Sequence, residues 1–179
     1  MDHLPTADLE TGLDLVRQAP REVGTLDMIV CRPAEEERRL LDQGELNLEE
    51  GLVGDNWRTR GGPDGAPDPE AQLTVMNSRY TDLVARRRDR WPLAGDQLYV
   101  DLDLSFEHLP PGSRLGVGSA IIEVSAQPHT GCDKFVARFG RDALRLANSQ
   151  VGRELRLRGL NAKVIEPGTI RVGDTVVKL

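Results

Sequence analysis

Cys132 is the residue best suited to chemistry in this sequence. It follows the turn-forming run PHTG (128–131), and a predicted helix beginning at this cysteine would direct unpaired N–H groups toward its sulfur. With Lys134 and His129 nearby, these groups favour the thiolate form, which can ligate a soft metal, carry a persulfide or attack an electrophile. The alternative is an ordinary core cysteine, which is how we interpret Cys31 at the end of an apolar run.

A second set of candidate residues lies in the glycine- and proline-rich stretch 51–70. Its composition is unsuited to a regular element, so we expect a long loop, and long loops in compact domains are often functional. Arg58 and Arg60 lie in its middle, where two guanidinium forks can hold a phosphate. The alternative is that both are solvated loop arginines. Trp57 is expected to anchor the loop by packing on the domain.

Glycine precedes aspartate at three predicted strand borders, positions 54–55, 95–96 and 173–174. Turn formation accounts for this pattern, because glycine adopts unusual φ angles and aspartate binds nearby backbone N–H groups. At 173–174 we adopt only this interpretation. Asp96 and the following Gln97 also pair acceptor and donor groups, so a role in a ligand pocket stays open for them.

Many short apolar runs separated by turn signals predict a mainly β protein with peripheral helices, of the α+β class, built on a closed or nearly closed β-barrel. Residues 1–20 are expected to form an N-terminal peripheral helix, and 21–179 a single barrel domain. Residues 34–42 are predicted to form a small charged helix or a turn. Strands are expected at 23–31, 72–76, 98–104, 113–118, 119–126, 160–168 and 169–179, and further helices at 78–90 and from 132 into the 140s.

Composition excludes several classes of protein. The net charge is −6, and the sequence lacks the basic footprint of a nucleic-acid-binding protein. No apolar stretch approaches the roughly 20 residues needed to cross a bilayer, so we expect a soluble, cytoplasmic protein without membrane association. Two distant cysteines and three scattered histidines offer no disulfide scaffold and no zinc-ligand spacing.

In the order of its segments, the sequence from about residue 23 to the end resembles the MOSC domain family, named for the C-terminal region of molybdenum cofactor sulfurases. The matching stretches are GLVGD (51–55), LAGDQLYVDLDLSFEHLPPGSRLGVGSAIIEVSA (93–126), PHTGCDKF (128–135) and RGLNAKVIEPGTIRVGDTVV (158–177). Three departures are visible. Gly-Asp-Gln-Leu stands where the family often has Gly-Glu-Asn-Leu, arginines stand where many relatives have loop histidines, and Gly-Cys stands in place of the frequent Pro-Cys.

The resemblance implies a MOSC-type barrel that either binds molybdenum cofactor (molybdopterin) or relays sulfur through Cys132, and it does not separate these roles. It implies Cys132 as the catalytic residue and the metal ligand. An oxidoreductase role on a small-molecule substrate would need a partner reductase, and sulfur relay a cysteine desulfurase. A non-catalytic binding module that lost the cofactor is the alternative. The residues expected to bind the cofactor, including its pterin edge and phosphate, are Arg58, Arg60, Asp96, Gln97, His129, Thr130 and Lys134.

Overall fold

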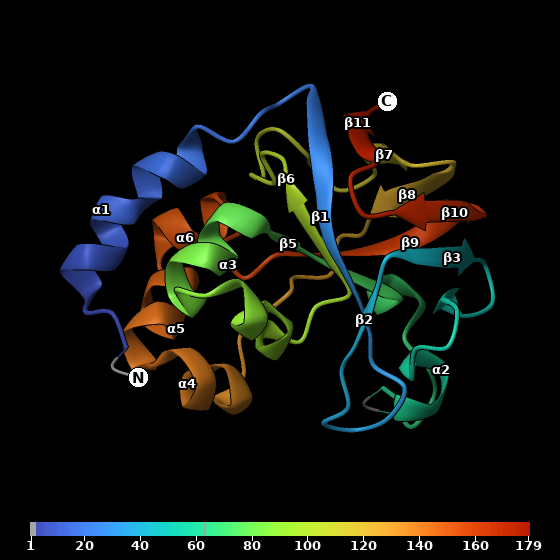
Figure 1. The fold of residues 1–179 in the computed structure, drawn as a ribbon, viewed down its shortest axis with the longest axis horizontal. Coiled ribbons are helices and arrows are strands. Elements are labelled where there is room, and N and C mark those ends of the chain that lie inside the picture. Colours follow the sequence, from blue (N-terminus) through green and yellow to red (C-terminus); the bar gives the residue numbers. More distant parts are fainter. Residues whose placement is uncertain (1–2, 63) are drawn as a thin grey trace.

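A closed β-barrel forms the centre of the protein (Figure 1). The computed structural model describes residues 3–62 and 64–179. Over these residues seven strands form a ring, in the order β1 (Val23–Cys31), β11 (Thr175–Lys178), β7 (Arg114–Val117), β8 (Ala120–Val124), β9 (Leu160–Glu166), β5 (Leu73–Asn77) and β6 (Leu98–Asp101). Pairing of β1 with both β11 and β6 closes the ring, and only β5 and β6 run parallel. The predicted barrel is confirmed.

The first strand organises the barrel, because it is long enough to pair with three others. Its start pairs with β11, its end pairs with β2 (Arg39–Leu41), and β6 pairs along much of its length. A register shift between Leu26 and Met28 turns Met28 out of the interior cluster that holds Leu26 and Ile29. Inward side chains fill the barrel, as expected for a ring of this size. The interior includes Leu26, Ile29, Leu73, Val75, Leu98, Val100, Leu115, Ile122, Leu160 and Val176.

A small second sheet, not predicted in full, consists of β3 (Gln43–Asn47), β4 (Gly51–Leu52) and β10 (Gly168–Arg171). Of the five residues of β3 only Gly44 and Leu46 are buried, so its sequence lacks an apolar stripe that would reveal a strand. For residues 34–42 the predicted turn is correct only at the start, because β2 occupies Arg39–Leu41, where no strand was expected.

Helices cover one side of the barrel, on the left of Figure 1. They are α1 (Thr6–Arg17), α3 (Ser78–Ala85), the 3-10 helix η2 (Arg88–Ala94), α4 (Asp133–Phe139), α5 (Arg141–Asn148) and α6 (Gln150–Glu154). They enclose a second apolar cluster against the outer face of the barrel, where Met28, Met76 and Tyr99 contribute side chains. The predicted amphipathic N-terminal helix is confirmed over α1, although its Leu15 is exposed. None of the helices within the described ranges has the length and apolar character to cross a membrane.

Two local predictions were wrong in part. The helix expected at 78–90 ends at Ala85, because Arg86 adopts a left-handed φ of 62° before η2 begins. The stretch 51–70 is not wholly irregular, since it contains β4, the short helix α2 (Trp57–Arg60) and the start of the 3-10 helix η1 (Pro69–Ala71). Tertiary contacts stabilise these short elements. The indole of Trp57 is buried and donates to the Asp68 carbonyl at 3.0 Å, a contact within the same stretch.

Candidate functional site

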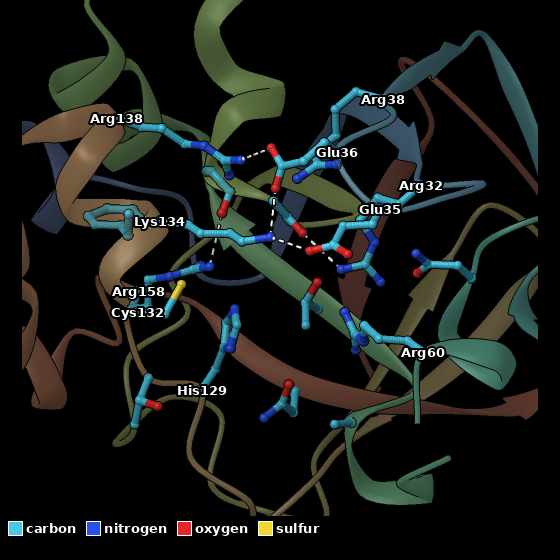
Figure 2. A pocket seen from close by; sticks show the side chains of 18 of the residues that line it. Arg32, Glu35, Glu36, Arg38, Arg60, His129, Cys132, Lys134, Arg138 and Arg158 are labelled. Carbon is cyan, nitrogen blue, oxygen red and sulfur yellow. Dashed lines mark hydrogen bonds and ion pairs between the residues drawn. The ribbon is translucent and has the colours of Figure 1, made fainter. Parts of the chain in front are cut away.

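A polar pocket of about 910 Å³ brings distant parts of the chain together (Figure 2). Its walls come from the turn after β1, from α2, from the segment before α4, from α4 itself, and from the residues around the start of β9. Figure 2 shows the labelled side chains of the turn and α2 facing those of the α4 side. Arg60 and Cys132 line the same pocket, so the 51–70 loop and Cys132 lie at one site.

A buried ion pair holds the loop at this pocket. Arg32 follows β1, and its guanidinium binds both carboxylate oxygens of Asp55, with Nε to Oδ1 at 3.0 Å and Nη2 to Oδ2 at 2.8 Å. Asp55 also accepts from the backbone N–H groups of Arg32 and Trp57, and Arg32 donates to the Gly95 carbonyl. Asp55 therefore does more than form the turn predicted for it, because it fixes the start of α2 against the end of β1.

A second buried carboxylate lies behind the opposite wall. Asp96 is fully buried and accepts from His129 Nε2 at 2.8 Å and from Arg158 Nη1 at 2.7 Å. Burial alone would raise the pKa of Asp96, but Arg158 and His129 outweigh it and hold the pKa below its ordinary value. Arg158 also donates to the Ala94 carbonyl and lies over the ring of Phe135. Asp96 thus orients two side chains that line the pocket.

His129 presents an acceptor to the pocket. Burial, followed by the charge of Arg158, lowers the pKa of His129, which favours the neutral imidazole. Nε2 must then carry the proton, because it faces the carboxylate of Asp96. Nδ1 is left with a free lone pair and no hydrogen bond to the described residues. This assignment of the tautomer follows from the hydrogen-bond partner.

Two buried polar atoms of the pocket residues lack a partner among the described residues. They are Nε of Arg158 and Oδ1 of Asn56. Unpaired buried polar atoms are uncommon in folded proteins, because each loses its hydrogen bonds to water. Arg60, on the loop side, also lines the pocket and makes no ion pair or side-chain hydrogen bond with the described residues. The pocket therefore contains hydrogen-bonding capacity that the protein itself does not use.

The predicted site residues divide into three groups. Arg60, His129, Thr130, Cys132 and Lys134 line the pocket, and Asp96 lies directly behind it. The structure does not bring Gln97 or Arg58 into the pocket. Gln97 is fully buried, and its side chain binds Asp55 and Thr74. Arg58 is exposed, and its Nη1 lies 3.8 Å from Oε2 of Glu49.

Sequence reasoning missed the arginines that complete the site. Arg32, Arg38, Arg138 and Arg158 all line the pocket, but they come from three separate segments: the turn after β1, α4 and the residues before β9. Only for Arg32 did the sequence hint at a polar role. An arginine that directly follows a buried strand and precedes a proline is poorly suited to packing in an apolar core. Nothing in the sequence indicated which of its many arginines would converge.

Cys132 is exposed at the N-terminal cap of α4, whereas Cys31 is only 3% exposed in the barrel core. Burial raises the pKa of the Cys31 thiol, with a further increase from Asp55. We therefore expect iodoacetamide to label Cys132 at least about tenfold faster than Cys31 in the folded protein. Mass spectrometry of tryptic peptides measures both rates, and labelling in guanidinium chloride provides the reference. Equal labelling in the folded state would contradict the burial of Cys31.

The protein is therefore a closed barrel with a helical layer, and a polar pocket that contains an exposed cysteine lies beside that layer. The sequence profile of the MOSC domain matches residues 61–177, and the chain belongs to the MOSC domain family. No curated protein is similar enough to count as a match. The resemblance stated from the sequence is thereby confirmed.

Solved structures show the same fold at low sequence identity. YuaD from Bacillus subtilis is 15% identical, with a TM-score of 0.63 over 86% of this chain and 94% of that one. YiiM from Escherichia coli is 21% identical, with a TM-score of 0.55 over 87% of this chain and 69% of that one. YiiM from Geobacillus stearothermophilus is 16% identical, with a TM-score of 0.59 over 87% and 75% of the two chains. At these identities the likeness concerns the fold alone.

Proposed function

We propose that the protein binds a molybdopterin-type molybdenum cofactor in this pocket, with the thiolate of Cys132 as a ligand of the metal. One observation carries the proposal: the exposed Cys132 lies in the wall of a pocket of about 910 Å³ that also contains unpaired polar atoms. A cysteine that only packed in the core would be buried, and one that only carried sulfur would need no such pocket. Membership of the MOSC family supports the choice of cofactor.

The residues of the pocket fit such a group chemically. A thiolate suits molybdenum as a soft ligand. The guanidinium of Arg60 is available for a phosphate, and Arg158 Nε, Asn56 Oδ1 and His129 Nδ1 offer a donor and two acceptors for a heterocycle. When bound, the cofactor would supply a metal centre for oxygen-atom or electron transfer. An oxidoreductase of this kind would need an electron-donor protein and a small-molecule substrate.

The chain's own residues would hold and orient the ligand. Asp96 keeps the proton of His129 on Nε2, so that Nδ1 stays an acceptor. Thr130 lines the same pocket and completes the proposed set, whereas Lys134, also in the lining, is paired with Glu35 and Glu36. Arg58 and Gln97 are not included, because Arg58 lies outside the pocket and Gln97 supports it from within the core. We also propose that residues 21–179 act as one barrel domain, to which the N-terminal segment 1–20 adds its helix.

Sulfur relay is the second candidate, favoured by the exposure of Cys132. In that role a cysteine desulfurase would transfer one sulfur atom to the thiolate, and the persulfide would pass it on. Incubation with desulfurase and cysteine would add about 32 Da to the wild-type protein and nothing to the Cys132→Ser variant. Protein that takes up neither molybdenum nor sulfur would favour the alternative of a binding module without a cofactor.

Arg60 and Arg58 provide a matched pair to test the cofactor proposal. Both belong to α2, but only Arg60 lines the pocket. We expect Arg60→Gln to weaken cofactor binding by about 10- to 100-fold, because a charged hydrogen bond to phosphate contributes about 1.5–3 kcal/mol. Arg58→Gln should leave it unchanged. Equilibrium dialysis of cofactor-loaded proteins, followed by metal analysis, gives the dissociation constants. Equal effects of the two variants, or none, would contradict the proposed binding mode.

A further inference from the structure

The pocket has an excess of positive charge. Among the described residues, six cationic side chains line it: Arg32, Arg38, Arg60, Lys134, Arg138 and Arg158. Asp55 and Asp96 neutralise two of them from behind the walls. The remaining four face only two lining carboxylates, Glu35 and Glu36, and the neutral His129 adds no charge. This excess occurs in a chain whose net charge is −6.

The two glutamates reach across the pocket from the turn between β1 and β2. Lys134 Nζ lies 3.0 Å from Glu35 Oε1 and 2.6 Å from Glu36 Oε1. Arg138 Nη2 lies 2.7 Å from the other oxygen of Glu36. Figure 2 shows Lys134 and Arg138 directed at these carboxylates from the α4 side. Arg38 lies on the turn itself, and its donors bind backbone carbonyls, those of Pro92 and Glu37.

We propose that Lys134, Arg138 and Arg38 form a second anion-binding subsite, which takes a phosphate-type dianionic group of a small ligand and which Glu35 and Glu36 fill when that ligand is absent. The two carboxylates present acidic oxygens to the same cations that a phosphate would use. The inference goes beyond the proposed function, because it concerns a ligand other than the cofactor. It applies to cofactor-free protein as well.

The contacts made by the glutamates are of a kind that a ligand can displace. The side chains of Glu35 and Glu36 are 84% and 56% exposed, and exposed ion pairs contribute little to stability. Glu36 also adopts a positive φ of 61°, a conformation that is unfavourable for a residue with a side chain. A compact dianion makes several charged hydrogen bonds without holding two long side chains and a strained turn in place. We therefore expect phosphate to displace the carboxylates of Glu35 and Glu36 from Lys134 and Arg138.

The test measures inorganic phosphate binding to cofactor-free protein by isothermal titration calorimetry at pH 7.5 and low ionic strength. Removing the competing carboxylates in Glu35→Gln/Glu36→Gln should tighten phosphate binding about tenfold. The matched control is Glu37→Gln/Glu45→Gln, which removes the same number of charges from exposed residues that do not line the pocket. Its affinity should stay within about twofold of the wild type.

Two further variants locate the phosphate. Adding Lys134→Gln to Glu35→Gln/Glu36→Gln should abolish the gain, whereas adding Arg60→Gln should preserve it. An unchanged affinity in Glu35→Gln/Glu36→Gln, an equal gain in the control, or a gain that survives Lys134→Gln would overturn the inference. A gain that depends on Arg60 alone would also overturn it, while leaving the cofactor proposal intact. Loss of cofactor binding in Arg60→Gln is measured separately, so the two proposals can fail independently.

Discussion

Replacing Asp96 by alanine is expected to lower the free energy of unfolding by about 3–5 kcal/mol, since it leaves a buried charge without its partner. The guanidinium of Arg158 is buried, with its side chain 7% exposed. It keeps its bond to the Ala94 carbonyl, but that dipole does not replace a carboxylate. His129 loses its orienting acceptor in the same variant. The damage therefore extends from stability to the geometry of the pocket.

Urea denaturation at pH 7, followed by circular dichroism, measures this loss. Because the pKa of Asp96 lies below its ordinary value of 3.8, the stabilisation is present at neutral pH and is lost only as the pH falls below that value. The variant Asp96→Ala/Arg158→Met removes both charges and should regain most of the stability. In contrast, Asp174→Ala, at a turn of the same Gly-Asp type, should cost about 1 kcal/mol, because this carboxylate accepts one backbone N–H group. Equal losses at positions 96 and 174 would show that the buried ion pair is not the cause.

The barrel could be predicted from the sequence because its strands bury apolar residues on the interior face. β1, β5 and β8 read as apolar runs, and turn residues separate most of the others. β2 and β3 could not be found in this way. β2 has no fully buried side chain and β3 buries only Gly44 and Leu46, and β3 pairs with β10, which lies far along the chain.

The site could be predicted only where its residues are close in sequence. Cys132, His129 and Lys134 lie in one short segment, and the sequence indicated them together. The ion pairs Arg32–Asp55 and Arg158–Asp96 join residues 23 and 62 positions apart, so only the fold could match each arginine to its carboxylate. Gln97 shows the opposite error. Its amide has the right chemistry for a ligand, but its position directly before β6 places it in the core, where it binds Thr74 and Asp55.

Distance along the chain also explains why the charge balance of the pocket could not be predicted from the sequence. Lys134 was expected to act on Cys132, yet its ammonium pairs with Glu35 and Glu36, which lie about a hundred residues earlier in the chain. Hydrogen bonds from Lys134, together with Arg138, hold the pKa of Glu36 below its ordinary value, so this carboxylate is charged at neutral pH. Pairing of this kind depends on where the turn after β1 lies in space.

Metal content tests most directly whether the thiolate of Cys132 holds molybdenum in this pocket. Wild-type protein, Cys132→Ser and Cys31→Ala would be purified from a host that makes molybdopterin and analysed by inductively coupled plasma mass spectrometry. We expect about one molybdenum per chain in the wild type and in Cys31→Ala, and a background level in Cys132→Ser, because a hydroxyl is a poor ligand for a soft site. Wild-type protein without molybdenum, or Cys132→Ser that retains the wild-type amount, would contradict the account.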